Sequence, residues 1–473
     1  MTKATAAVIG TGPNGLTAGI ILAKAGIETI IYEAESLIGG GARSAESTHP
    51  GFIHDVCSAV YPLGIGSPAF ASFPLAEHGL EWIQPKFPLA HPLDDGSCVS
   101  LDADLEAFAE LQGFDGRVYR KIVQPFVAGW SGLVADALAP IHFPCRPLLF
   151  GAFGTLALSP AIHSARLLFR TEQMRALFAG LAAHSILPLS ALGSSAFAWL
   201  LATAAHAVGW PIARGGAQSI SNALASYFRS LGGQIVTNTR IKILDELNDP
   251  GFVLCDVTPQ QFLTLAGAKL PDSFRAQLAA YRYGPGVFKM DWALREPIPW
   301  RAAACSEAGT IHLGGSFQEI VEAEAAPARG EIQNRPFVLL AQPSLFDSRR
   351  APDGGHTAWG YCHVPNASRV DMAERIEAQI ERFAPGFQKT ILARRICTPA
   401  DLERHNSNLV GGDISGGSNH VGQLFLRPTR SLYRTPLKNV YLCSASTPPG
   451  GGVHGMCGFH AACTALHDAG IGM

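Results

Sequence analysis

The start of the chain carries the feature that most constrains its fold. A short apolar run, Ala6 to Ile9, meets the glycine-rich sequence Gly-Thr-Gly-Pro-Asn-Gly at residues 10–15, and a helix-like segment follows through Lys24. A second apolar run then ends at Glu33, 18 residues after the third glycine. Strand, glycine turn, helix, strand and acid, in this order, are the parts of a βαβ dinucleotide-binding unit.

Each part of this unit has a physical task. Gly10 permits the sharp turn out of the strand, and Gly12 lets the backbone approach a pyrophosphate because it has no Cβ. Gly15 allows close packing of helix and strand. The helix N-terminus offers unpaired N–H groups to phosphates, and Glu33 can accept hydrogen bonds from ribose hydroxyls. The spacing therefore predicts dinucleotide binding.

The charge balance argues against nucleic acid as a partner, and the hydropathy indicates extensive apolar surfaces. The chain has 36 Lys and Arg against 38 Asp and Glu, which gives no electrostatic footprint for nucleic acid. Charged residues make up only 16% of the chain, below the ~25% of ordinary soluble chains. Hydrophobic residues reach 47%, and they predict a large core, an apolar cavity, a membrane-contacting face or a homo-oligomer interface.

The cysteines and the first residues bear on metal binding and location. Ten cysteines are scattered without a Cys-x-x-Cys motif, and the spacing of Cys457 and Cys463 fits no common zinc site. We therefore expect no metal, and buried thiols in a reducing compartment. Residues 1–5 lead directly into the first strand, so we expect a cytoplasmic protein without a signal peptide.

One long segment has no ionic side chain. Residues 176–213 contain no Asp, Glu, Lys or Arg, yet Pro188 and Gly193 interrupt them. A transmembrane helix needs about 20 predominantly apolar residues, and the best helical piece, Ser195 to Val208, is shorter. We favour packed helices that line an apolar cavity; a monotopic membrane-contacting surface and a true span remain alternatives.

The order of patterns predicts an α/β protein with two domains. Strand and helix patterns alternate at the start, resume after residue 209 and return at the C-terminus, whereas residues 275–405 read mainly as strands. We expect a discontinuous dinucleotide-binding domain with a Rossmann-like parallel sheet, made of residues 1–70, 209–271 and 406–473. An inserted mixed α+β substrate domain would comprise residues 71–208 and 272–405, with an apolar helical part at about 122–208.

Several motifs together resemble the phytoene dehydrogenase-related flavoproteins of the wider amine-oxidase-like group. They are GTGPNG (10–15), E-A-x-x-x-x-G-G (33–40), GWPIARGGAQSISNALA (209–225), GPGVFKMDWAL (284–294), NLVGGDISGG (408–417) and YLCSASTPPGGGVHGMCGFHAA (441–462). The resemblance covers nearly the whole chain. It implies an FAD-dependent oxidoreductase with the ADP half of FAD on the first glycine loop and the flavin under the C-terminal glycine turn.

The resemblance also implies a set of site residues. Expected cofactor-binding residues are Gly10, Gly12, Pro13, Asn14, Gly15, Glu33, Ala34, Gly40, Gly41, Arg43, Val236 or a neighbour at the adenine, Gly452, Val453 and Met456. Two positions depart from the pattern of related enzymes. Gly41 stands where they often carry arginine, and Ser444-Ala445-Ser446 occupies the region of an acid for the ribitol.

Lys289 and His454 are the catalytic candidates. In amine oxidases a G-x-V-x-K strand places a lysine beside flavin N5 through a water, and Gly286 to Lys289 resembles that strand. The alternative for Lys289 is solvent exposure or a salt bridge with Asp291 or Glu296. His454 lies within the expected flavin cap.

Three functions follow from these expectations. The first is FAD-dependent oxidation of a hydrophobic small molecule such as a polyene, isoprenoid or lipid, with peripheral membrane contact as an option. The second is flavin-dependent isomerisation of a double bond without net redox change. The third is a flavin-binding interaction protein without turnover.

Overall fold

The first of two main sheets is parallel and collects strands from three distant parts of the chain. The computed structural model describes residues 5–472. The sheet has the order β16-β10-β1-β2-β9, and all neighbouring strands run parallel. Its members are β1 (Thr5–Ile9), β2 (Glu28–Tyr32), β9 (Gln234–Val236), β10 (Phe252–Cys255) and β16 (Val440–Leu442). This arrangement confirms the expected Rossmann-like sheet.

The second sheet is mixed and has seven strands in the order β15-β11-β14-β13-β12-β6-β7. Only its β12–β6 pair is parallel. The strands are β6 (Phe87–Pro92), β7 (Cys98–Leu101), β11 (Gly286–Leu294), β12 (Ala308–Leu313), β13 (Val338–Ala341), β14 (His356–Val364) and β15 (Ile391–Cys397). Two small sheets, β3 (Ser44–Glu46) with β4 (Ile53–Asp55) and β5 (Trp82–Ile83) with β8 (Ile212–Ala213), complete the strands.

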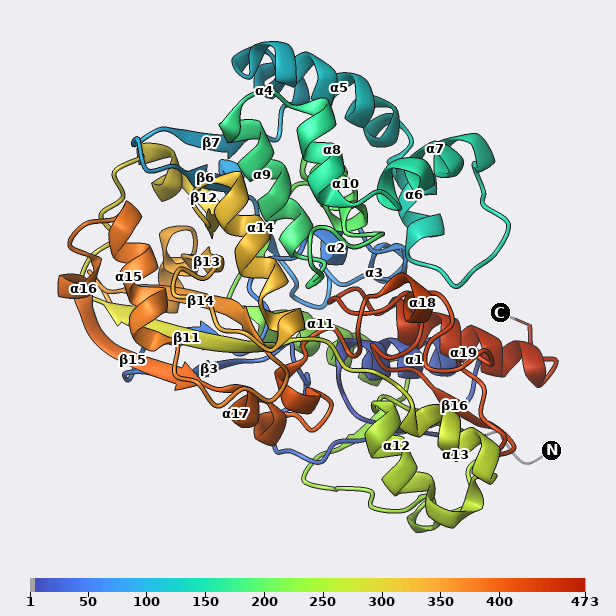
Figure 1. Cartoon of the computed structure of the whole chain (residues 1–473). Helices are drawn as coiled ribbons and strands as arrows, with labels where there is room; N and C mark the ends of the chain where they lie inside the picture. The colour runs from blue at the N-terminus through green and yellow to red at the C-terminus, as the bar shows by residue number, and fades with distance from the viewer. Residues whose placement is uncertain (1–4, 473) are drawn as a thin grey trace.

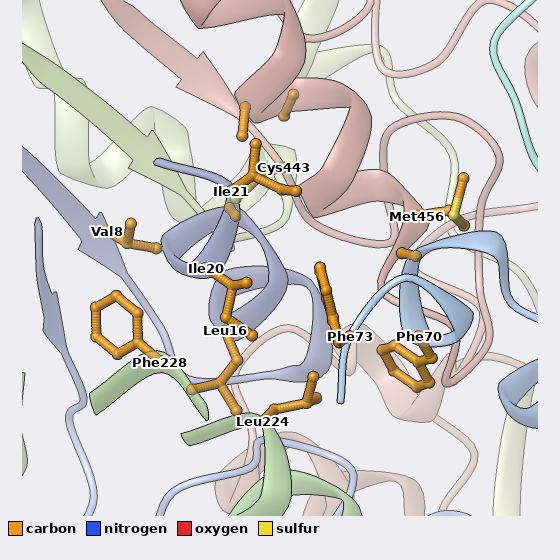
Figure 2. Close-up of a cluster of buried hydrophobic side chains, with 14 of the residues drawn as sticks. Val8, Leu16, Ile20, Ile21, Phe70, Phe73, Leu224, Phe228, Cys443 and Met456 are labelled. Atoms are coloured by element: carbon orange, nitrogen blue, oxygen red, sulfur yellow. The ribbon is translucent and has the colours of Figure 1, made fainter. Parts of the chain in front are cut away.

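The core beside the parallel sheet is built around helix α1 (Pro13–Lys24). Its residues Leu16 and Ile20 are fully buried, with Phe228 of α11 (Ala217–Ser230) and Met456 of α19 (Met456–Asp468) in the same cluster. Figure 2 shows these side chains around the α1 ribbon. On the opposite face the sheet packs against α12 (Pro259–Ala266) and α13 (Asp272–Ala279).

The apolar segment forms packed helices. Residues 172–207 hold α9 (Glu172–Ala183) and α10 (Ser195–Ala207), and the buried Phe178 and Trp199 contact each other between them. Figure 1 shows these helices above the mixed sheet, with the parallel sheet and its helices below. The other helices of this upper part are α4 (Leu105–Leu111), α5 (Gly113–Ala128), α6 (Trp130–Ala137), α7 (Pro147–Ala157) and α8 (Ala161–Leu168).

The remaining helices are short or flank the mixed sheet. They are α2 (Pro62–Ile65), α3 (Pro68–Ala71), α14 (Phe317–Ala325), α15 (Ala373–Phe383), α16 (Phe387–Thr390), α17 (Pro399–His405) and α18 (Val421–Leu424). Within residues 5–472, no single helix has the length and hydropathy to cross a membrane. Helices α7 and α8 pass the length and hydropathy criteria only as a pair, and they meet at 98°.

The predicted division into two domains stays a prediction. The two sheets draw their strands from different segments, but the chain after the expected boundary at residue 70 still packs on the first core. Phe73, Leu75 and Leu80 lie in the cluster around α1.

Candidate cofactor and substrate cavity

A cavity of about 600 Å³ is lined by residues of both main sheets. Its volume lies within the ~300–1,000 Å³ of ligand pockets. The parallel strands contribute their carboxyl ends: Gly10 follows β1, Glu33 follows β2, Asp256 follows β10 and Ser444 closely follows β16. Open α/β sheets bind ligands at this edge, so the topology itself points to the cavity.

The glycine loop has the geometry that its sequence requires. Gly10 has a positive φ of 102°, and its N–H donates to the carbonyl of Tyr32 at 2.8 Å. A Cβ on Gly15 would lie 2.1 Å from the carbonyl oxygen of Gly10, so only glycine permits this close approach of helix and turn. Gly10, Gly12, Pro13 and Asn14 line the cavity, whereas Gly15 lies beneath them.

The carboxylate of Glu33 is fixed in place at the cavity wall. Its Oε2 accepts hydrogen bonds from the Thr11 backbone N–H at 3.0 Å and from the Thr11 hydroxyl, and its Oε1 accepts from the Glu35 N–H at 3.0 Å. Glu33 and Ala34 both line the cavity. A carboxylate held in this way keeps accepting capacity for ligand hydroxyl groups.

Asp256 is a second carboxylate at the same loop, and the sequence analysis did not single it out. Its Oδ2 accepts the N–H of Gly15 at 3.0 Å, so a side chain from β10 caps helix α1. A Cβ on Gly12 would lie 2.5 Å from this oxygen. Burial raises the pKa of Asp256 to about 7, and the nearby Glu33 acts in the same direction, against the Gly15 hydrogen bond.

Arg43 is hydrogen-bonded to the second glycine-rich segment, residues 39–41. Its Nε donates to the Gly40 carbonyl at 2.8 Å, and its Nη2 lies 2.8 Å from Nε2 of His405. Burial and the charge of Arg43 lower the pKa of His405 to about 4, so this ring is a neutral acceptor at pH 7. Gly40, Gly41 and Arg43 line the cavity, which leaves Arg43 within reach of a bound anion.

Part of the C-terminal turn reaches the cavity and part turns away from it. Gly452 and Val453 line the cavity. His454 is buried, accepts the Met456 N–H on its Nδ1 at 3.1 Å, and does not line it. Met456 packs in the core around α1, as Figure 2 shows. Their expected flavin contacts stay untested, and the geometry indicates that both residues shape the turn.

Val236 also lies outside the cavity wall. Its carbonyl accepts the Glu33 N–H at 2.8 Å, and its side chain is exposed. The segment that does line the cavity is 239–242, three residues further along. The sequence around β9 gives no signal for this segment, because the segment follows the strand as an irregular loop.

Lys289 forms a buried ion pair. Its Nζ lies 2.7 Å from both carboxylate oxygens of Asp291, and both side chains are about 3% exposed. Lys289 does not line the large cavity; Cys57, Trp359 and Tyr361 line both that cavity and the small void beside Lys289. Of the two expectations for this residue, the geometry favours the salt bridge with Asp291, and a role beside the flavin stays untested.

The opposite end of the cavity is apolar. We call it the apolar end and define it by Ile186, Phe197, Leu201, Leu339, His184 and Tyr361. Phe197 and Leu201 project from one face of α10 because they are four residues apart. The charged residues that line the cavity belong to the glycine-loop side, namely Glu33, Glu35, Arg43, Arg240, Lys242, Asp256 and Arg404.

The residues present fit a dinucleotide. Gly40 packs so closely on the loop that its Cβ would lie 3.1 Å from Cα of Gly12, which keeps this part of the wall free of side chains. Oδ1 of Asn14 is buried without a hydrogen-bond partner among the described residues. A buried, unsatisfied acceptor at the loop is the kind of group that a ligand hydroxyl or water satisfies.

Away from the cavity, one group of side chains has metal-ligand chemistry. Ligand atoms of Asp136, in the last turn of α6, and of His142 and Cys145, in the loop after it, lie within 4.8 Å of one another. His142 Nε2 and the Cys145 N–H are each 3.0 Å from Oδ1 of Asp136. These contacts close the loop by hydrogen bonding alone, and we assign no metal to it.

Comparisons with known proteins agree with this geometry. Residues 8–73 match the family model of the NAD(P)-binding Rossmann-like domain. The chain is 26% identical to mouse pyridine nucleotide-disulfide oxidoreductase domain-containing protein 2, over 98% of this chain and 93% of the relative. It is 24% identical to the lycopene-forming phytoene desaturase of Pantoea ananas, over 95% of this chain and 96% of the relative.

The fold also matches solved structures. A putrescine oxidase variant superposes with a TM-score of 0.62 at 15% sequence identity, over 98% of this chain and 99% of the other. At this identity the match concerns the fold alone, a Rossmann-like parallel sheet joined to a mixed sheet.

Proposed function

Because this chain is an oxidoreductase of the superfamily that includes the phytoene desaturases and the amine oxidases, we propose that it binds FAD in the 600 Å³ cavity and oxidises a hydrophobic small molecule there. The observation that carries the proposal is the continuity of this cavity. It runs from the glycine loop to a wall of aliphatic and aromatic side chains.

The glycine-loop side would hold the ADP half of the cofactor. Gly10, Gly12 and Asn14 leave backbone accessible beside the N-terminus of α1, where a pyrophosphate is favoured. Glu33 would accept hydrogen bonds from the ribose hydroxyls. Arg43 would add a cation within the same wall.

The middle of the cavity would hold the flavin ring against Gly452 and Val453. Bound there, FAD supplies an acceptor for a hydride from a substrate C–H bond. Ser444 and Ser446 line the cavity near the same turn, and their hydroxyls can replace an acid at the ribitol. Tyr61 and Trp359 narrow the cavity with rings that exclude water.

The apolar end would hold the substrate. Its wall consists largely of Ile186, Phe197, Leu201 and Leu339, and each buried methylene of a ligand gains about 0.8 kcal/mol there. The name of the Pantoea relative gives phytoene, a polyene, as its substrate. That name supports a hydrophobic substrate for this chain and does not identify it.

Reduction of the flavin tests this proposal. Flavin-loaded protein is mixed anaerobically with polyenes, isoprenoid alcohols and apolar ketones, and its visible absorbance is followed. Oxidation predicts bleaching with one substrate class and recovery when an electron acceptor is added. Product formation without bleaching or acceptor consumption indicates double-bond isomerisation instead, and no product with any class would favour a non-catalytic role.

We also propose that the surface around α7 contacts a lipid bilayer. Phe143 and Leu148 are 84% and 92% exposed, and Ile141 and Leu158 are exposed nearby in the sequence. Leu192 is also exposed, and the hydrogen bond from the Gly193 N–H to the Leu158 carbonyl brings it close to this segment. Residues 137–171 contain three arginines and no Asp or Glu. Apolar side chains together with basic charge favour a membrane with anionic lipids.

A further inference from the structure

We propose that the apolar end selects a substrate that carries a neutral oxygen acceptor, such as a ketone, aldehyde or ester carbonyl, and that His184 and Tyr361 donate hydrogen bonds to it while His312 positions His184. The inference rests on the proposed function, because it identifies the substrate class of the same cavity. It concerns binding and orientation of the substrate, and adds no chemical step.

His312 and Tyr361 lie on the same face of the mixed sheet. His312 of β12 is paired in register with Leu339 of β13, which is paired with Tyr361 of β14. Residues opposite each other on neighbouring strands project to the same side. Leu339 and Tyr361 line the cavity, so this row forms its floor, with His312 buried at one end.

The surroundings of His312 determine which of its nitrogens carries the proton. Its Nδ1 is buried without a partner in the described chain, and it lies 2.5 Å from the position that a Cβ on Gly180 would take. An N–H at Nδ1 would therefore point at the Gly180 methylene with no acceptor. A bare Nδ1 can instead accept a weak contact from the Gly180 Cα–H, which an N–H there could not, so the proton belongs on Nε2.

This tautomer fixes the state of His184. The two Nε2 atoms of His184 and His312 lie 3.0 Å apart, so one must donate and the other must accept. With the proton on Nε2 of His312, Nε2 of His184 accepts. Burial lowers the pKa of His184 to about 3, so the ring stays neutral at pH 7 and its proton must be on Nδ1.

The resulting N–H of His184 opens onto the cavity. His184 caps the C-terminus of α9 and lines the cavity beside Ile186. Among the described residues no acceptor lies within hydrogen-bond distance of its Nδ1, and this atom is not among the buried unpartnered ones. It is therefore an accessible donor in an apolar wall.

Tyr361 supplies a second donor. Its hydroxyl makes no hydrogen bond with the described residues and is also not among the buried unpartnered atoms, although the ring is packed against Trp359 and His363. Burial raises the pKa of the phenol above its usual range, so the hydroxyl keeps its proton. Two donors thus share a wall with Leu339.

The charges around the apolar end exclude ionic substrates. Glu324 is a carboxylate close enough to affect Tyr361 electrostatically, but it is buried with an oxygen 2.8 Å from Nδ1 of His363, and neither Glu324 nor His363 lines the cavity. An ammonium group would therefore meet a neutral N–H and no described carboxylate. A hydrocarbon would leave both donors unsatisfied, and sites built to hydrogen-bond a substrate discriminate strongly against such analogues.

Nitrogen NMR tests the tautomers independently of any activity. Protein with ¹⁵N-labelled histidine is measured from pH 5 to 8, and His184→Phe identifies the His184 signals. We expect Nδ1 of His184 to be protonated and Nε2 unprotonated across this range. A proton on Nε2, or titration of His184 within the range, would overturn the inference.

Ligand binding tests the selectivity. Flavin-loaded protein is titrated with 2-undecanone, undecane and undecylamine, and the shift of the flavin absorbance gives each affinity. We expect the ketone to bind most tightly. Loss of one donor in His184→Phe or Tyr361→Phe should weaken ketone binding about two- to twelvefold, which corresponds to roughly 0.5–1.5 kcal/mol for a net hydrogen bond, and should leave undecane binding unchanged.

Matched variants distinguish the loss of a hydrogen-bond donor to the ketone from a non-specific structural effect of the substitution. His206 is half-buried and bound to the Tyr119 hydroxyl away from the cavity, so His206→Gln should bind the ketone like the wild type. His312→Leu should weaken ketone binding, and His312→Gln should restore it, because the amide N–H can replace the Nε2 donor. Equal binding of the three ligands by flavin-loaded protein would overturn the selectivity and leave the proposed function standing. Failure to take up flavin would instead contradict the proposed function.

Discussion

Two carboxylates flank the glycine loop at which the phosphates of the proposed cofactor would lie. The Glu33 carboxylate accepts hydrogen bonds from the Thr11 and Glu35 N–H groups, whereas the Asp256 carboxylate accepts a single described hydrogen bond, from the Gly15 N–H. An ionised Asp256 would oppose a pyrophosphate, and its raised pKa allows it to be neutral near pH 7. The protonation of one residue therefore bears on cofactor affinity.

The prediction is that FAD affinity falls as pH rises through 7. The protonated form of Asp256, which predominates below its pKa of about 7, does not repel the phosphates, and the ionised form above that pH does. The dissociation constant, followed by quenching of FAD fluorescence, should rise by up to about tenfold per pH unit between pH 7 and 8.5. Asp256→Asn keeps an oxygen for the Gly15 N–H and should remove this rise.

A wild-type affinity independent of pH would contradict this account, as would an unchanged pH slope in Asp256→Asn. Burial and the charge of Arg43 lower the pKa of His405 to about 4, so His405 adds no slope between pH 7 and 8.5.

Lys289 gives a second prediction at this scale. Removal of one partner of a buried ion pair typically costs about 3–5 kcal/mol, because the other charge stays buried without compensation. Lys289→Met should lower the free energy of unfolding by this amount in urea titrations, and Lys289→Met combined with Asp291→Leu should recover much of it. Unchanged stability with altered reoxidation of the flavin would instead support a role beside the cofactor.

The site residues differ in how far sequence could predict them. Gly10, Gly12 and Glu33 were predictable because their spacing serves one backbone geometry, and the cavity wall includes all three. Lys289 and Met456 depend on which way a strand or helix faces, and tertiary packing decides that. Asp256 had an available signal, an acid directly after a parallel strand, but no local pattern shows that it meets the glycine loop from another strand.

At the scale of elements, helix α1 is held between the parallel sheet and α19. Gly458 of α19 allows this contact, because a Cβ there would lie 1.8 Å from the backbone oxygen of Asn14. Gly19 on α1 is also close-packed, though less tightly, since its Cβ would lie 2.7 Å from the Ile31 side chain of β2. The glycines of these elements therefore fix the position of the loop that α1 carries.

The prediction for this contact is that Gly458→Ala destabilises the protein. The added methyl group meets backbone that cannot move without shifting α1, and overpacking of this kind typically costs about 1–3 kcal/mol. Gly151→Ala is the matched control: it also lies in a helix, α7, but its Cβ would have open space. The control should gain about 0.5–1 kcal/mol from helix propensity.

Thermal unfolding of both variants measures the difference. A Gly458→Ala protein as stable as the wild type would show that α19 does not press on α1 as described. A Gly458→Ala protein that keeps its stability but loses flavin would show that the substitution affects only the glycine loop, residues 10–15.

Most elements were predictable because their patterns are local. The expected strand Ala6 to Ile9 lies within β1, the expected helical segment through Lys24 corresponds to α1, and the expected helical piece Ser195 to Val208 corresponds to α10. The pairing of strands was harder to predict from the sequence. No local pattern shows that β6 pairs with β12 in parallel, or that β16 pairs with β10 across nearly 200 residues. Long-range pairing depends on the whole chain, so sequence patterns predicted the strands and left most of their order open.

At the scale of the whole molecule, the apolar residues form both an internal cavity wall and an exposed surface around α7. The cavity links the glycine loop to an apolar wall, and the surface around α7 exposes apolar side chains beside basic ones. Figure 1 shows α6, α7 and the long connection between them at the edge of the molecule. The apolar excess of the sequence is thus divided between core, cavity and surface, a division that composition alone could not give.

The surface proposal predicts binding to anionic vesicles. Wild-type protein should co-sediment with vesicles of phosphatidylglycerol and less with phosphatidylcholine, and Phe143→Ser with Leu148→Ser should reduce this binding several-fold because the inserting side chains are lost. Leu111→Ser is the control, since Leu111 is 75% exposed on α4, outside the segment around α7. Equal sedimentation of both variants, or self-association that the surface mutations abolish, would count against a lipid partner.

The central claim is that the glycine loop and cavity hold FAD, and the cofactor content of the purified protein tests it most directly. The protein is expressed with ample riboflavin, purified and denatured, and the released cofactor is identified by chromatography and quantified per chain. The account predicts FAD close to one per chain, and its loss in Gly12→Val, whose side chain would occupy the loop beside Asp256. A colourless protein that takes up no added flavin, or a Gly12→Val variant as yellow as the wild type, would contradict it.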